Sequence, residues 1–185
     1  EDEILYQGPG YTIARTSKSG TLVPYGAADR FDGNVNHGWL DLRGRPELVS
    51  EVPEARKSEG LAELLRVIAA PESRIMSLTC ECAAFGPEGP NPWTVGGFVD
   101  VTYREGDMNV DPQRFVNLAC AILHGIVPSK EHQIGVEFIV EPLKSFFGRT
   151  DCYGLMIKPL GRGDTEAEAW ASFGYAASAV ANSIS

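Results

Sequence analysis

The chain has 185 residues, and its 16 Lys and Arg against 25 Asp and Glu give a formal net charge of −9 at pH 7 and a sequence pI near 4.8. Hydrophobic residues make up 43% and charged residues 22%, which is typical of a folded globular chain. The negative charge disfavours nucleic-acid binding and adsorption to an anionic membrane, since both need clustered Lys and Arg. It favours a basic protein partner, and the length predicts a single domain over residues 1–185.

The expected compartment and redox state depend on targeting signals and on the number of cysteines. The chain has no apolar run long enough for a transmembrane helix, and its opening residues Glu1–Leu5 lack the basic start and apolar stretch of a signal peptide. Its four cysteines are too few for a disulfide scaffold. We therefore expect a cytoplasmic protein with reduced cysteines, although the sequence does not exclude a single disulfide.

Apolar residues at helical spacing predict three amphipathic helices. The first has Pro53 in its first turn and ends near Ala70. The second begins at Asp111-Pro112, an N-cap residue followed by proline at the first helical position. The third begins at Asp164-Thr165, where Thr165–Glu168 has the spacing of a capping box.

Alternation of apolar and polar residues predicts the strands, which we place at 11–16, 36–42, 74–84, 94–104, 132–141 and 152–160. Clean alternation is typical of an antiparallel sheet with one buried face. The order ββα-ββα-ββα predicts an α+β domain, in which an antiparallel sheet carries three helices on one face. The similarity of residues 97–107 and 154–164 suggests an internal repeat, although any strand–turn–helix succession produces some likeness.

Metal and cofactor sites are not expected. Cys80 and Cys82 fall on the core-facing side of a strand, and helical geometry turns His124 away from the buried stripe of its own helix. Zinc needs four ligands that converge, which this arrangement does not provide. The chain also lacks a nucleophile-elbow motif, a zinc-protease motif and a phosphate-binding loop.

Two alternatives to a binding protein remain open. A small-molecule enzyme would use His37 with Asp29, Asp32 or Asp41, in a pocket between the long first loop and the sheet. The plainer interpretation of this region is a turn, because Asp-Gly-Asn at residues 32–34 is typical of one. The other alternative is a self-associating structural subunit, so a homodimer is not excluded.

The sheet face that the helices leave open is the leading candidate for partner binding. It combines apolar anchors with carboxylates that would steer a basic partner. The loops 86–93 and 142–149 each join two strands, and we expect them at the same end of the sheet. Competing interpretations are that a loop covers the face and that the tryptophan of loop 86–93 folds back onto the core. The candidate residues of the face and loops are Trp39, Asp41, Glu81, Trp93, Phe98, Asp100, Glu137, Glu141 and Phe146.

The strands Gly38-Trp39-Leu40-Asp41-Leu42 and Gly97-Phe98-Val99-Asp100-Val101, with the size, acidity and α+β outline, make the chain resemble the immunity proteins of bacterial polymorphic toxin systems. The resemblance implies a non-enzymatic inhibitor that docks on a basic partner such as a toxin nuclease. The carboxylates of the open face would then mimic the phosphates that a nuclease binds. Trp39 and Phe98 would be the apolar anchors.

Overall fold

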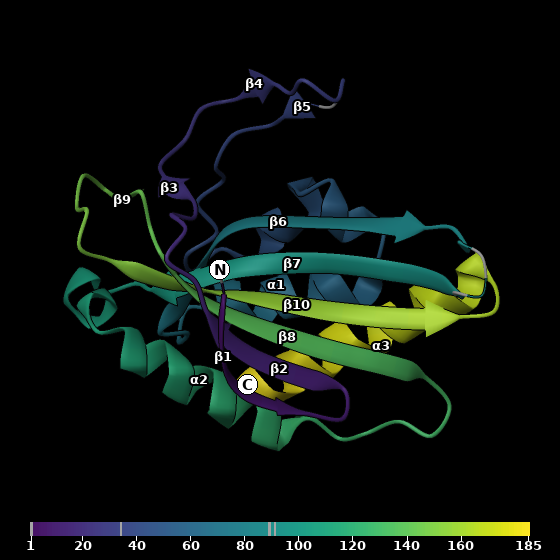
Figure 1. Cartoon of the computed structure of the whole chain (residues 1–185). Helices are drawn as coiled ribbons and strands as arrows, with labels where there is room; N and C mark the ends of the chain where they lie inside the picture. Colours follow the sequence, from purple (N-terminus) through teal and green to yellow (C-terminus); the bar gives the residue numbers. More distant parts are fainter. Residues whose placement is uncertain (1, 34, 89, 91) are drawn as a thin grey trace.

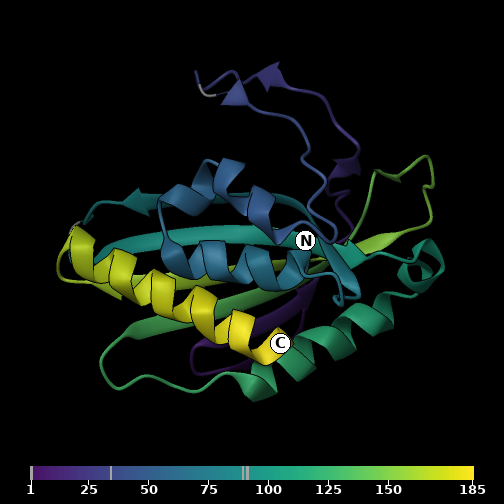
Figure 2. The same ribbon diagram turned by 180° about the vertical axis from the view of Figure 1, so that it is seen from behind.

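The computed structural model describes residues 2–33, 35–88, 90 and 92–185. In this part of the chain it is an α+β fold, in which three α-helices lie on one face of a six-stranded sheet with the order β1-β2-β8-β10-β7-β6 (Figures 1 and 2). The sheet strands are β1 Glu3–Gly8, β2 Tyr11–Arg15, β6 Ile75–Phe85, β7 Trp93–Tyr103, β8 Gln133–Pro142 and β10 Tyr153–Gly163. The helices are α1 Glu59–Ala69, α2 Pro112–Gly125 and α3 Glu166–Ile184.

Shorter helices and strands lie in the segments that connect these main elements. Three 3-10 helices are η1 Pro46–Glu51, η2 Glu54–Arg56 and η3 Gly106–Val110. Two short strand pairs are β3 Leu22–Val23 with β9 Ser145–Phe146, and β4 Ala28–Asp29 with β5 Val35–Asn36. The β4–β5 hairpin projects beyond the β6 edge of the sheet (Figure 1). None of the helices in the described ranges has the length and apolar character needed to cross a membrane.

The sheet is mixed, so the prediction of a purely antiparallel sheet is wrong. β2 lies parallel to β8, with Tyr11 opposite Val136, while the other neighbouring strands are antiparallel. The strand predicted at 36–42 is also wrong, because only Val35–Asn36 is extended in a strand and Gly38 turns the chain with φ 86°.

The ββα repeat is not confirmed. Gly97 lies inside β7, whereas Gly154 is the second residue of β10, so the two similar segments enter their strands at different points. The β6–β7 and β8–β10 connections lie at opposite ends of the sheet, because β6 and β8 run in opposite directions (Figure 1). The expectation that they share one end is therefore wrong.

The helix caps explain where the helices begin. Asp111 accepts a hydrogen bond from the backbone of Gln113, and the capping box of Thr165 and Glu168 is present as expected. α1 begins later than predicted, because Ser58 caps it, and residues 53–57 form the separate turn of η2 instead.

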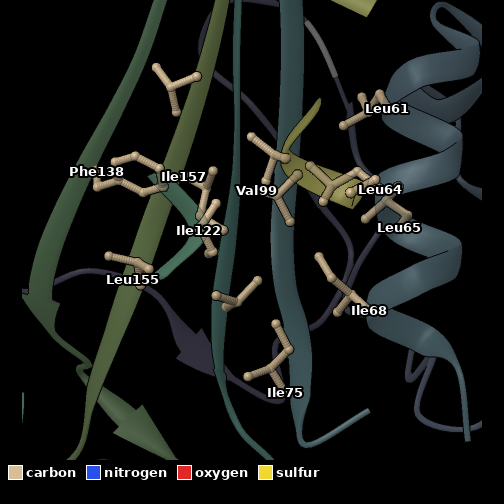
Figure 3. Close-up of a cluster of buried hydrophobic side chains, with 14 of the residues drawn as sticks. Leu61, Leu64, Leu65, Ile68, Ile75, Val99, Ile122, Phe138, Leu155 and Ile157 are labelled. Atoms are coloured by element: carbon tan, nitrogen blue, oxygen red, sulfur yellow. The ribbon is translucent and has the colours of Figure 1, made fainter. Parts of the chain in front are cut away.

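The main hydrophobic core lies between the helices and the sheet. Leu61, Leu64, Leu65 and Ile68 of α1 point toward the central strands, where Val99 of β7 is fully buried (Figure 3). The close seating of the helices depends on glycine. A Cβ on Gly60 would lie 2.1 Å from the carbonyl oxygen of Gly174 in α3, and one on Gly161 would lie 2.0 Å from a backbone nitrogen of α3.

The opposite face of the sheet is covered at one end only. A segment of residues 16–25, here called the strap, crosses the ends of β8, β10 and β7 and continues into the loop toward α1 (Figure 1). Together with residues 143–152 it encloses a second, smaller apolar cluster. The buried members of this cluster are Val23, Met76, Leu78, Leu143, Phe146 and Cys152.

The contact at Gly60 predicts a stability effect. Gly60→Ala should lower the free energy of unfolding by up to about 2 kcal/mol. The new methyl group meets rigid backbone and the two helices must separate, at a cost of about 1–3 kcal/mol, which the gain in helix propensity offsets by about 1 kcal/mol. Urea unfolding measures this loss. Gly26→Ala is the matched control, since a Cβ there meets nothing within 4 Å, and equal effects for the two substitutions would contradict the packing argument.

Candidate functional site

The carboxylates expected on the open sheet face do not form an exposed acidic surface. Asp100 is only 2% exposed and Glu141 only 5%, because the strap covers their end of the sheet. The prediction that these two are exposed is therefore wrong. Glu81 and Glu137 reach solvent, but each is paired, with Arg30 at 3.5 Å and Lys158 at 2.8 Å respectively.

Asp41 lies outside the sheet and is held by its own loop. Its carboxylate accepts two hydrogen bonds from the Arg43 guanidinium, at 2.9 and 2.8 Å. These bonds hold the pKa of Asp41 below its usual value. Phe98 is half-buried on the open face. The open face therefore carries paired charges around an aromatic side chain rather than a row of free carboxylates.

Three of the predicted aromatic anchors, Trp39, Trp93 and Phe146, pack against other parts of the same chain. The indole of Trp39 donates a hydrogen bond from Nε1 to the Ser77 carbonyl at 3.4 Å and meets the Phe147 ring edge-on at 5.5 Å. Phe146 is buried in the second cluster, and the exposed member of the pair is Phe147. Trp93 packs half-buried against the main core, as the interpretation of a folded-back tryptophan expected.

A cavity of about 600 Å³ lies beside the edge strand β6. Its walls are formed by residues 77–83 of β6, by residues in and around η1 and η2, and by part of the first loop. The lining residues of the first loop are Tyr25, Arg30, Val35, Asn36, His37, Gly38, Trp39, Leu40 and Leu42. We call it the β6-side cavity. It occupies the place expected for a pocket between the first loop and the sheet, and His37 lines its exposed rim.

The acid–base arrangement proposed for an enzyme is not assembled. Asp29, Asp32 and Asp41 all lie outside the cavity lining. Asp32 pairs with Arg30 at 2.9 Å, Asp41 pairs with Arg43, and Asp29 is exposed on β4. Among the described residues, His37 is therefore not brought together with these three carboxylates.

Aromatic rings and charged groups line the β6-side cavity. Tyr25 donates its hydroxyl to the Leu78 carbonyl at 3.2 Å, and Trp39 stands beside it on the same segment. Burial is the main cause of the raised pKa of Tyr25. The charged lining residues are three carboxylates and two cations, namely Glu51, Glu54, Glu81, Arg30 and Lys57.

The two cysteines of β6 reach the cavity without becoming reactive. Cys80 and Cys82 are among its lining residues and are free thiols, as are Cys120 and Cys152. Burial raises the pKa of Cys82 to about 11 and also raises that of Cys80. Both therefore stay protonated at neutral pH, which makes them poor nucleophiles and poor metal ligands. Within the described ranges, no three His, Cys, Asp or Glu side chains converge to hold a metal.

Most of the charged lining of the cavity could not be predicted from the sequence. Glu51 ends η1, and Glu54 begins η2 at a position predicted to lie in the first turn of a longer helix, so neither was marked as a neighbour of β6. Only the folded chain brings the turn residues and the strand together.

Comparisons with protein-family models, with curated proteins and with solved structures find no match for this chain. The fold and site define the class as an α+β fold with a cavity beside an edge strand.

The Trp39 hydrogen bond predicts local stability in the cavity wall. Trp39→Phe keeps an aromatic ring in place but removes the donor to Ser77, a loss of about 1 kcal/mol. The backbone N–H of Trp39, bonded to the Tyr25 carbonyl at 3.0 Å, should then exchange with solvent about fivefold faster. Hydrogen-exchange mass spectrometry on residues 25–40 measures this.

Trp170→Phe is the matched control, because the indole of Trp170 bonds to Glu166 within α3. If the exchange rates of residues 25–40 change with neither substitution, the hydrogen bond of the Trp39 indole does not stabilise the cavity wall.

Proposed function

We propose that this protein is a non-enzymatic inhibitor of the immunity type, and that its β6-side cavity receives a basic side chain of a partner protein. The proposal rests on one observation, which is that two aromatic rings and three carboxylates line the same cavity. These are the rings of Tyr25 and Trp39 and the carboxylates of Glu51, Glu54 and Glu81. A guanidinium or ammonium group gains from both, through cation–π attraction and charge-assisted hydrogen bonds.

Two carboxylates give the cavity its preference for a cation. Glu81 is paired with Arg30, and Lys57 lies 3.5 Å from the Cys82 carbonyl. In the described part of the chain, the carboxylates of Glu51 and Glu54 form no ion pair within 4 Å, so they are available to a ligand. The net charge of −9 adds a field that attracts a basic partner over a longer range.

Among the described residues, Asp29, Asp32 and Asp41 do not line the cavity beside His37, which favours binding over the acid–base catalysis considered for this region. The docking surface then lies beside β6 rather than on the open sheet face. As an inhibitor of this kind, the protein would act in the cytoplasm.

The cavity's preference can be tested with defined probes. The blocked tripeptide acetyl-Gly-Arg-Gly-amide should shift the NMR resonances of the Trp39 indole, His37 and Ala83. The same peptide with citrulline, a neutral isostere of arginine, should bind at least about fivefold more weakly, because it lacks the charge. Glu54→Lys should weaken binding of the arginine peptide by a similar factor.

Glu131→Lys makes the same charge change in the exposed connection before β8 and should leave the affinity unaltered. Equal binding of the arginine and citrulline peptides would refute the proposal. So would arginine-induced shifts that lie away from the cavity.

Binding of the natural partner should depend on salt. Proteins captured by the wild type and by Glu131→Lys, but lost with the double variant Glu51→Lys/Glu54→Lys, are the candidates. Such a partner should be basic and lose its own activity on binding. Its association rate should fall about tenfold or more between low and high ionic strength, because salt screens the steering field. A rate insensitive to salt, or a partner that stays active when bound, would contradict an inhibitor of this kind.

A further inference from the structure

The strap (residues 16–25) is fastened to the sheet by a few hydrogen bonds. The backbone N–H of Thr16 donates to Val140 at 2.9 Å, and that of Gly20 donates to Pro142 at 2.7 Å. Farther along, β3 of the strap pairs with β9, the Lys144 N–H donates to the Thr21 carbonyl at 3.1 Å, and the Phe147 N–H donates to the Val23 carbonyl at 2.9 Å. Residues 17–19 of the strap are exposed. The strap is therefore a single layer of chain over this end of the sheet, and its stability also depends on the groups that lie beneath it.

Two carboxylates lie beneath the strap. Asp100 comes from β7 and Glu141 from β8, on the sheet face opposite the helices. The strand between them is β10, which places Gly154 opposite Glu141 and Met156 opposite Asp100. Both carboxylates are more than nine-tenths buried.

The strap touches both carboxylates directly. The hydroxyl of Thr21 donates to Oδ2 of Asp100 at 3.1 Å. Gly20 lies so close to the other carboxylate that a Cβ on it would stand 2.2 Å from Oε1 of Glu141. Within the described chain, Oδ1 of Asp100 and Oε1 of Glu141 are buried without a hydrogen-bond partner.

The surrounding charged groups do not neutralise the pair. Arg15 of β2 lies opposite Val140, whose side chain is in the main core on the helix side of the sheet. The Arg15 side chain therefore points to that side, away from Glu141. On the segments that cover the pair, Lys18 and Lys144 are exposed, and neither forms an ion pair with the two carboxylates. On the neighbouring strands, Lys158 is bound to Glu137 and the Cys80 thiol is neutral at pH 7. At the end of the strap, the Tyr25 hydroxyl is neutral at pH 7 as well.

Burial therefore favours the protonated forms. It raises the pKa of Asp100 to about 7, against the smaller opposing effect of the Thr21 hydrogen bond. Burial, with the added repulsion of Asp100, raises the pKa of Glu141 to about 8. When the strap lifts, water reaches both groups and their pKa values return toward the ordinary range near 4.

We infer that Asp100 and Glu141 form a proton-operated latch, which holds the strap closed while they are protonated and lets it lift when they ionise. Two ionised carboxylates that are buried from water with unpartnered oxygens destabilise the closed cover, whereas two protonated ones do so far less. Lifting would expose the second apolar cluster and release Tyr25, which is part of the wall of the β6-side cavity. The latch does not depend on the identity of any partner.

The direction of the pH effect follows from proton linkage. The closed state binds more protons than the open state, because its two pKa values are raised. Opening therefore releases protons, and the closed state loses stability as pH rises from about 4 to about 8. Below this range both states are protonated, and above it both are ionised, so the opening equilibrium is then independent of pH.

Hydrogen exchange of the strap tests the latch. The amide of Gly20 in the strap, and those of Lys144 and Phe147 bonded to the strap's carbonyls, report its opening. After correction for intrinsic exchange rates, their opening constant in the wild type should rise about tenfold or more between pH 5 and pH 8. In Asp100→Asn/Glu141→Gln it should no longer vary with pH.

Glu137→Gln is the matched control, because it removes an exposed carboxylate from the same face of β8. It should keep the wild-type pH dependence. A wild-type opening constant that does not change with pH would overturn the latch. So would a flattened dependence in Glu137→Gln.

A direct titration covers the case in which the double variant fails to fold. Carboxyl carbon-13 NMR of the wild type should give both groups pKa values above 6, whereas values near 4 would overturn the latch. Because this readout involves no partner, it separates the latch from the proposed function, which can fail while the latch stands.

Discussion

Packing of all three helices against one face of the sheet is the contact on which the other features depend. It buries the apolar side chains of the central strands, and glycines at Gly60 and Gly161 let the helices approach closely enough to exclude water. It also leaves the opposite face without regular structure to cover it. The strap and the connection between β8 and β10 cover one end of that face, mostly with irregular chain that is joined by the short β3–β9 strand pair.

The candidate site arises at the boundary of this partial cover. Where the first loop leaves the sheet and turns toward α1, it does not fill the space beside β6, and a cavity results. Tyr25 and Trp39 fasten the loop to strand carbonyls and line the cavity as well. The same two side chains therefore determine the stability of the cavity wall and the chemistry that it offers to a ligand.

Alternation and helical spacing predicted most of the regular elements, because these patterns report which side of an element is buried. They placed Asp100 and Glu141 correctly on the face away from the helices. They could not reveal that this end of the face is covered, since the strap contacts it across a long sequence separation and has no periodicity of its own. For the same reason the parallel pairing of β2 with β8 and the lining by Glu51 and Glu54 were not predictable. Trp39 and His37 were predicted as candidate site residues because an aromatic anchor and an acid–base group are recognisable from residue type alone, and both line the cavity. The carboxylate partners expected for His37 were wrong.

The parallel neighbours β2 and β8 also constrain the order in which the molecule is built. Residues 11–15 pair with residues 136–140, so the edge made by β1 and β2 cannot join the sheet until most of the chain has left the ribosome. The strap, which continues from β2, must wait for the same event. Sequence-distant pairings of this kind slow folding, because the loop must close before its contacts are gained. Residues 11–25 are synthesised before most of the sheet and yet are among the last to pack, and during that interval the end of the face that the strap later covers is open to water and to other chains.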